Sequence, residues 1–492
     1  MLVWACFFAN LSRTIGQTKS EQTKDPRPIV RIHDTSVTPF LLPENGIDFG
    51  DPFPSYWDGV WHLYTMGSDY RRVTHFTSTD LVKWTEHEPA MIGEDIATGT
   101  VVRHDNQYYL FYTDSDIQQI RLVVSDNPWV FDFSKSKLVA KADEKVYKMD
   151  KKKFRDAHVF YYEKEQLWWM LIEATSDDAC AIGLFKSKDL LTWTQHDPIS
   201  KEKSHVHASC PQVFEKDGRW YLTYLDYGTR YATADTPYGP WDFRSKYHSQ
   251  YFTAASRSTT DGKRQLCWGY FAKFGYSTPE RGLRGYGERI GVGREMVFND
   301  DGDIGVRPLP ELITAIHQAP NKVDLFDCVK VRSGKWDIDS ADGTLHSEDN
   351  NGGVLLFDLP EKKADYYFET DIEIEAPQTL VAVAVRTTEN CEGGYRVVIE
   401  PNHNKIAIRQ GKPKEGTFDK KSLAFAKGKS VKLQIFISGN RMEAFVDGRA
   451  SLSALILERS EHRVAIEVAI SGTRNEPSSR NSLNINRYFS PP

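Results

Sequence analysis

Short runs of alternating apolar and polar residues, separated by turn residues, fill the chain from about residue 48 to about residue 312. The clearest predicted strands are rich in aromatic side chains and follow polar turns, at Val60–Tyr64, Leu167–Leu171 and Arg219–Tyr224. Turn residues such as Trp57–Gly59 fall between two such runs, as a hairpin requires. Helical periodicity is confined to a short piece at Glu311–His317. The pattern therefore predicts an all-β fold.

The strand pattern recurs at intervals of about fifty residues, which is typical of a β-propeller with about four strands in each blade. A second repeated motif supports this spacing. Ser78–Trp84 and Ser187–Trp193 each consist of a polar turn followed by a Trp that can pack between blades. We expect five blades, each beginning with its innermost strand, near Gly50, Thr98, Arg155, Ser209 and Gln250.

A second domain is predicted after Pro320, since 492 residues exceed one ordinary core. Apolar or alternating runs occur at Val354–Phe357, Tyr366–Thr370, Val381–Val385, Tyr395–Ile399 and Lys432–Phe436. Such strands, separated by short turns, predict a β-sandwich of the jelly-roll or lectin-like kind. The expected organisation is an apolar N-terminus and disordered lead over residues 1–30, a propeller over 31–320 and a sandwich over 321–492.

Three related phrases put a small or acidic residue just ahead of a short apolar strand, at Gly50–Pro54, Phe154–Phe160 and Ala208–Phe214. The first strands of propeller blades converge on the axis, so residues at their starts face one funnel. Asp51, Asp156, Ser209 and Thr98 are expected to meet there.

Paired carboxyl groups such as Asp51 and Asp156 are what glycosidic bond hydrolysis uses. Arg155 precedes Asp156 and could hold a carboxylate through a bidentate pair. Tyr251 is one of several aromatic residues near strand starts that could form the wall of a sugar pocket.

The net charge, the cysteine content and the apolar N-terminal run limit which binding partners, cofactors and locations the sequence predicts. A net charge of −6 argues against a nucleic-acid or anionic-membrane surface and favours uncharged sugars. Six scattered cysteines without a C-x-x-C pair predict neither a metal site nor a cofactor. The apolar run Leu2–Leu11 is too short to span a bilayer but could belong to an export signal, which favours an extracellular or periplasmic location. Oligomeric state is not readable from the sequence.

The chain resembles glycoside hydrolase family 32, the β-fructosidases such as invertase, inulinase and levanase. The resemblance rests on the phrases Gly50–Pro54, Ala97–Val102, Phe154–Asp156, Ser209–Pro211, Asp261–Arg264 and Arg294–Leu312. It implies a five-bladed propeller with a C-terminal sandwich. It also implies that Asp51 is the nucleophile that attacks the anomeric carbon of fructose, and that Asp156 binds sugar hydroxyls and steadies the transition state.

The chain departs from the family at Ser209, where the family has the Glu that acts as general acid and base. A serine hydroxyl is too weak an acid for that role. Another acid could reach the leaving oxygen. His207 and His205 lie just upstream of Ser209, and histidine is a residue type suited to proton transfer near neutral pH. Glu94, Asp95 and Glu173 are further candidates. Alternatively the substrate or linkage differs, or the protein is a non-catalytic sugar binder.

Overall fold

The structure is a computed structural model of the 492-residue chain. It describes residues 29–33, 40–41, 49–148, 153–205, 207–226, 228–246, 252–253, 257–271, 290–319, 323–341, 344–347, 352–359, 365–373, 379–411, 417–426, 428–456, 463–470, 481–484 and 488–489.

The fold is all-β, as predicted, and its first part is a series of antiparallel sheets in chain order. The first sheet has the order β1-β5-β4-β3-β2, with β1 (Ile29–His33), β2 (Phe49–Trp57), β3 (Val60–Gly67), β4 (Arg72–Ser78) and β5 (Trp84–Ile92). The second has the order β6 (Ile96–His104), β7 (Gln107–Asp114), β8 (Gln119–Ser125) and β9 (Lys137–Ala140), with the 3-10 helix η1 (Phe133–Lys135) before β9.

The following sheets repeat the same up-and-down order. They are β10 (Arg155–Tyr162), β11 (Leu167–Ser176), β12 (Ala179–Ser187) and β13 (Thr194–Glu202); then β14 (Ser209–Lys216), β15 (Arg219–Leu225), β16 (Thr229–Ala234) and β17 (Asp242–Lys246). A further sheet has the order β19 (Ser258–Thr260), β20 (Gln265–Cys267), β22 (Arg294–Phe298) and β23 (Ile304–Pro308).

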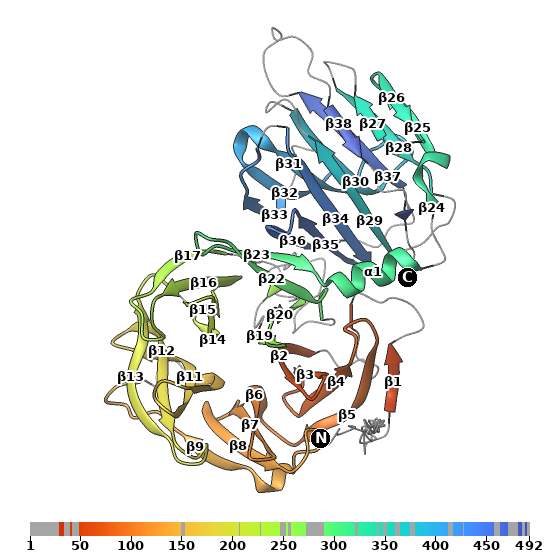
Figure 1. The fold of residues 1–492 in the computed structure, drawn as a ribbon. Helices are drawn as coiled ribbons and strands as arrows, with labels where there is room; N and C mark the ends of the chain where they lie inside the picture. The colour runs from red at the N-terminus through yellow and green to blue at the C-terminus, as the bar shows by residue number, and fades with distance from the viewer. Residues whose placement is uncertain are drawn as a thin grey trace, which may run out of the picture.

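These sheets are arranged around a common centre (Figure 1). The strands β2, β6, β10, β14 and β19, called the inner strands below, begin their sheets. Strand β2 contacts β6, β6 contacts β10, and β10 contacts β14. The side chain of Gln212 on β14 then bonds to Ser258 on β19, and β19 contacts β2. Residues at the inner-strand starts therefore gather at one end of a shared axis.

The predicted start near Gln250 is wrong, because the inner strand of the last sheet begins at Ser258. The strand β18 (Phe252–Thr253) pairs instead with β21 (Tyr270–Phe271) in a separate two-stranded ribbon. The predicted packing of tryptophans is confirmed for Trp84, which meets Trp268 edge-on with ring centroids 5.9 Å apart. The number of blades stays a prediction.

A short helix, α1 (Pro310–Gln318), follows β23 at the predicted place and leads into a second group of strands. One seven-stranded sheet has the order β25 (Val329–Ser333), β28 (Gly353–Phe357), β37 (Arg463–Ile470), β30 (Thr379–Thr387), β31 (Tyr395–Glu400), β32 (Lys405–Gln410) and β33 (Thr417–Ser422). The other has the order β26 (Trp336–Asp339), β27 (Thr344–Ser347), β38 (Asn481–Asn484), β29 (Tyr366–Glu373), β34 (Ser430–Ser438), β35 (Arg441–Val446) and β36 (Ala450–Leu455). The remaining short elements are β24 (Val323–Asp324), which pairs with β39 (Tyr488–Phe489), and the 3-10 helices η2 (Leu325–Asp327) and η3 (Pro401–His403).

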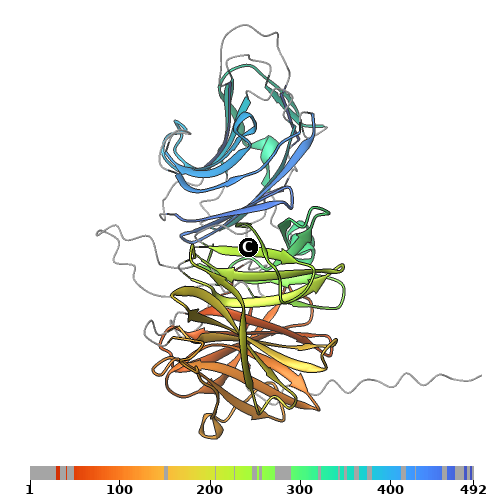
Figure 2. The same cartoon turned by 90° about the vertical axis from the view of Figure 1, so that its left-hand side faces the viewer.

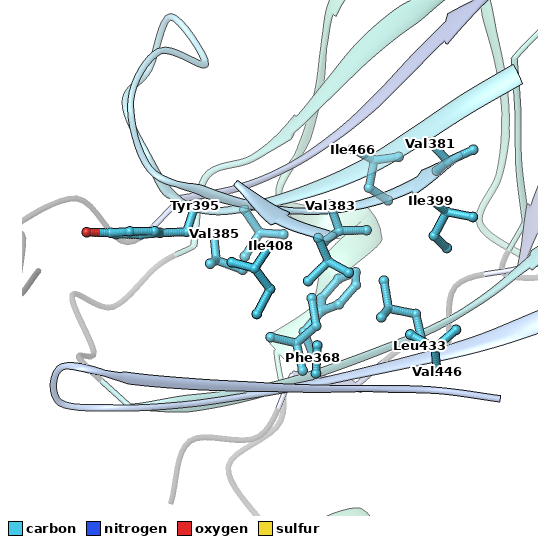
Figure 3. Close-up of a cluster of buried hydrophobic side chains, with 14 of the residues drawn as sticks. Phe368, Val381, Val383, Val385, Tyr395, Ile399, Ile408, Leu433, Val446 and Ile466 are labelled. Atoms are coloured by element: carbon cyan, nitrogen blue, oxygen red, sulfur yellow. The ribbon is translucent and has the colours of Figure 1, made fainter. Parts of the chain in front are cut away.

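The two seven-stranded sheets enclose a core of branched aliphatic and aromatic side chains (Figure 3). Alternate residues of β30 and β31, such as Val383 and Val397, point into this core and are fully buried. Phe368 and Leu433 come to it from the other sheet. The predicted strands of this region all form, because their period-two pattern matches a sheet with one apolar face.

The second group of strands stands directly against the first (Figure 2). Strand β23 contacts β35 and β36, and a Cβ added to Gly305 would collide with the carbonyl oxygen of Gly448. Arg294 of β22 donates to Glu443 of β35 at 2.8 Å, and both side chains are fully buried. An ion pair and a close backbone approach thus fix the two parts together.

Candidate active site

Four inner strands carry a β-bulge near their start, where two residues lie between successive residues that pair with the next strand. In β2 the register shifts between Gly50 and Phe53, which leaves Asp51 in the bulge. The equivalent shifts in β10 and β14 leave Asp156 and Cys210 in theirs, and the shift in β6 includes Thr98. Because a bulge re-aims the side chains that it carries, the repeat sends four side chains toward one end of the axis.

The bulge backbone is left-handed at three of these positions, with φ of 45° at Asp51, 63° at Asp156 and 50° at Cys210. Asp is among the few non-glycine residues that adopt this region with any frequency, and such conformations cluster at functional sites. The structure also corrects the alignment of the three phrases. Cys210, not Ser209, stands in the position of the two aspartates, and Ser209 stands in the position of Arg155.

Asp51 is half-buried among polar groups. The Thr98 hydroxyl donates a short hydrogen bond to its Oδ2. Burial and the neighbouring charge of Asp156 raise the pKa of Asp51 to about 6, against the lowering effect of Thr98, Arg257 and Arg155. Asp51 is therefore ionised above about pH 6 and protonated below it.

Asp156 is 6% exposed, and its Oδ2 accepts a hydrogen bond from the backbone N–H of Cys210 at 3.1 Å. Its own N–H donates to the hydroxyl of Thr113 at 2.8 Å, which fixes the bulge against β7. Burial raises the pKa of Asp156, an effect that Arg155 opposes. The charge of Asp156 acts on Asp51, so the structure brings these two carboxyl groups close together, and their joint role stays a prediction.

Arg257, directly before β19, was not predicted as a site residue. It is 2% exposed and donates from Nη2 to the carbonyl oxygen of Asp156 at 2.7 Å. Its Nη1 donates to the carbonyl oxygens of Gly99 and Ala157 and to the hydroxyl of Thr100. The signal that could have found it is its place directly before the last inner strand, whose start was predicted eight residues too early.

Ser209 and Arg155 both bind Glu173, a fully buried residue of β11. Arg155 donates from Nε to Glu173 Oε2 at 2.7 Å, and the Ser209 hydroxyl donates to the same oxygen at 2.7 Å. Burial favours the neutral carboxyl, but His207, Arg155 and Ser209 together outweigh it and lower the pKa of Glu173 to about 2. Glu173 is therefore an anion that accepts hydrogen bonds, which argues against its candidacy as proton donor.

His207 lies beside this cluster, with its side chain 35% exposed and Nδ1 3.7 Å from Glu173 Oε1. Lys153 Nζ is 3.5 Å from the same nitrogen. His205 is turned elsewhere, since its ring meets that of Phe243 edge-on and its Nε2 is 3.4 Å from the Tyr224 hydroxyl.

The other candidates separate clearly. Glu94 pairs with Arg71 at 3.2 Å on the exposed surface, and Asp95 Oδ1 accepts from Ser115. Tyr251 lies outside the described residues. Within the described ranges, no cluster of three or more His, Cys, Asp or Glu has the arrangement of a metal site, and no helix is long and apolar enough to cross a membrane.

The chain was compared with protein-family models, curated proteins and solved structures. Residues 51–278 match the family model of the glycosyl hydrolases family 32 N-terminal domain. Over these residues, a little under half of its length, the chain is similar to glycosyl hydrolase family 32. The match begins at Asp51 and runs through the Asp156 and Ser209 positions to residue 278.

Curated relatives in the family are distant and only partly covered. A β-fructofuranosidase, insoluble isoenzyme 4, of Oryza sativa subsp. japonica is 27% identical over 197 residues, which is 36% of this chain and 33% of the relative. A levanase of Bacillus subtilis (strain 168) is 28% identical over 212 residues, which is 39% of this chain and 29% of the relative. The alignments thus span about a third of these relatives' length.

Solved structures of family members share the fold over most of the chain. The sucrose-6-phosphate hydrolase of Lactobacillus gasseri superposes with a TM-score of 0.65 at 13% identity, over 91% of this chain and 93% of that one. A fructan 1-exohydrolase IIa of Cichorium intybus, in complex with 1-kestose, has a TM-score of 0.65 at 13% identity, over 92% of this chain and 98% of that one. At this identity the likeness shows the fold alone.

Proposed function

We propose that the protein hydrolyses fructosides or a related furanoside through a retaining reaction in which Asp51 is the nucleophile. Similarity to the family supports the reaction class, and the names of the relatives support the substrate class. The observation that carries the proposal is the matched pair of bulges, which brings Asp51 and Asp156 into mutual electrostatic contact beside Arg257.

In the first step, a carboxylate oxygen of Asp51 attacks the anomeric carbon as the glycosidic C–O bond breaks. Asp156, held by the Cys210 N–H, binds sugar hydroxyls and stabilises the positive charge that develops on the ring. Water then attacks the fructosyl-enzyme ester and restores Asp51. Arg155 and Ser209 contribute to the sugar site through their shared partner Glu173, and Thr98 through Asp51.

The leaving oxygen needs a proton, and we assign its delivery to His207. Ser209 is too weak an acid, and Glu173 carries no proton at neutral pH. Glu173 instead orients the His207 imidazole, as a buried carboxylate does in other His-dependent sites. Tyr251 remains a proposed wall residue.

Turnover of aryl fructofuranosides tests this proposal, because a good leaving group needs little protonation. Asp51→Asn should reduce kcat/KM by on the order of 10³-fold or more, since it removes the nucleophile. Asp177→Asn is the matched control, an exposed aspartate that also has a left-handed backbone and pairs only with the surface residue Lys201. His207→Ala should spare aryl substrates and slow natural ones. Equal, slow release by wild type and Asp51→Asn would exclude hydrolysis, and equal rates for His207→Ala and wild type on both substrates would remove His207.

The second candidate is a non-catalytic carbohydrate-binding protein of the same fold. The replacement of the family's acid at Ser209 favours it, because the pocket keeps its sugar-binding aspartate without a strong proton donor. Binding of fructose that Asp156→Asn abolishes, with no turnover of aryl fructofuranosides by wild type, would support this alternative.

A further inference from the structure

A cavity of about 730 Å³ lies at the opposite end of the inner strands from the two aspartates. Its walls come from the later residues of β2, β6, β10 and β14 and from β19. On β2 its lining runs from Phe53, two residues after Asp51, to Trp57, six residues after it. A volume in the range of about 300–1,000 Å³ is typical of small-molecule sites.

A layer of side chains separates this cavity from the aspartates. Arg257 lines the cavity, while its two Nη groups bind the backbone of the β6 and β10 bulges. Beside it, Gln212 donates to the carbonyl oxygen of Ser258 at 2.7 Å and accepts from the Ser258 N–H at 2.8 Å. The described residues thus form two sites on one axis, not one continuous pocket.

The lining combines aromatic faces with small polar groups. Trp57, Phe160 and Trp168 contribute aromatic rings, of which Trp57 and Phe160 are half-buried. Hydroxyl and amide groups come from Ser55 and Gln265, and a hydroxyl keeps acceptor capacity when it also donates a hydrogen bond. This lining fits a ligand whose ring packs on the aromatic faces and whose hydroxyl groups form hydrogen bonds to the hydroxyl and amide side chains.

Ion pairs occupy charged groups at the cavity rim. Arg103 pairs with Asp58 at 2.7 Å, and Arg264 pairs with Asp261 at 3.0 Å. On the floor, Nε of Arg257 is buried and has no hydrogen-bond partner among the described residues. A buried donor without a partner is costly, so an oxygen acceptor at the floor is favoured. The buried donor on the floor therefore favours an oxygen-rich ligand.

We propose that this cavity is a second carbohydrate-binding site, which takes a neutral mono- or disaccharide at the mouth opposite to Asp51 and Asp156. The inference does not depend on the proposed hydrolysis, because the aromatic, hydroxyl and amide groups named for binding have no part in the reaction, and of the residues named Arg257 alone contacts both places. In a fructoside hydrolase, such a site would hold a sugar that is not being cleaved.

Calorimetric titration of Asp51→Asn with sucrose, and separately with fructose, tests the proposal without interference from turnover. We expect two binding events per chain. Adding Phe160→Ala should weaken one event on the order of tenfold and spare the other. Phe298→Ala is the matched control, because Phe298 is equally half-buried in a different apolar cluster. Thr259→Trp, which fills the cavity instead of enlarging it, gives a second variant with the same expected loss.

The sites are told apart by Asp156→Asn, which should abolish only the event that Phe160→Ala spares. In the wild-type background, Phe160→Ala should leave the turnover of aryl fructofuranosides unchanged. One binding event that Asp156→Asn removes, or two events that neither Phe160→Ala nor Thr259→Trp weakens, would overturn the proposal. Turnover has no part in these binding results, so failure of the second site and failure of the proposed hydrolysis are distinguishable.

Discussion

The hydrogen bond from Thr98 to Asp51 offers a sharp test of how the site sets the protonation of its nucleophile. Above a pKa of about 6, Asp51 is ionised and competent to attack; below it, kcat/KM should fall about tenfold for each pH unit. The Thr98 hydroxyl lowers that pKa, because its hydrogen bond is stronger to the carboxylate than to the neutral acid.

Replacing Thr98 by valine keeps the shape of this fully buried side chain and removes the donor. A hydrogen bond to a charged group contributes about 1.5–3 kcal/mol, and 1.36 kcal/mol corresponds to about one pH unit. The acid limb of kcat/KM should therefore move upward by about one to two pH units in Thr98→Val, to about pH 7–8. Thr98→Ser keeps the donor and should keep the limb near pH 6.

The assay is the pH profile of aryl fructofuranoside hydrolysis, whose leaving group needs little help from an acid. The carboxyl resonance of Asp51, followed by NMR on ¹³C-labelled protein, measures the same titration without turnover. Circular dichroism at each pH establishes that both variants stay folded. Coincident acid limbs for wild type and Thr98→Val would refute the assignment of this hydrogen bond to the control of Asp51.

Two further predictions concern stability. Glu443→Ala should lower the free energy of unfolding by about 3–5 kcal/mol in urea titrations, because it leaves Arg294 buried without its carboxylate; the double variant Arg294→Met/Glu443→Leu should lose much less, and equal losses would contradict this account. Burial and the neighbouring His87 lower the pKa of His62 to about 3. Between about pH 6.5 and pH 3, His62 is therefore protonated in the unfolded chain but neutral in the folded chain. As the pH is lowered through that window, the free energy of unfolding should decrease more steeply in wild type than in His62→Gln, by up to about 1.4 kcal/mol per pH unit. Parallel plots of unfolding free energy against pH would show that His62 does not contribute.

The sequence predicts which strands form and which end of the ring collects Asp51, Asp156, Thr98 and Ser209, because the repeat spacing and the period-two pattern are local properties. It does not reveal that Cys210 occupies the position of the aspartates. That depends on where each bulge falls against its partner strand, and a register shift of one residue leaves little trace in the composition of a strand.

Arg257 and Glu173 were harder to assign for a different reason. Their roles arise from contacts across 101 and 36 residues, between strands that only the closed arrangement of sheets brings together. Glu173 reads in the sequence as one polar residue in an apolar strand, which is compatible with either a proton donor or a buried acceptor. The direction of the shift in its pKa decides between them. That direction is set by His207, which lies in the segment before β14, and by Arg155 and Ser209 of other strands.

The recurrent bulge has a consequence for how this architecture can change. Four of the five inner strands carry a bulge near their start, and the hydrogen-bonded ladder continues on either side of it. A substitution at a bulge position changes the chemistry of the candidate site without changing the pairing of the strands. The side chains at these bulges can therefore be exchanged while the strands keep their pairing. Ser209, directly before the β14 bulge, is an example of such a change at the site.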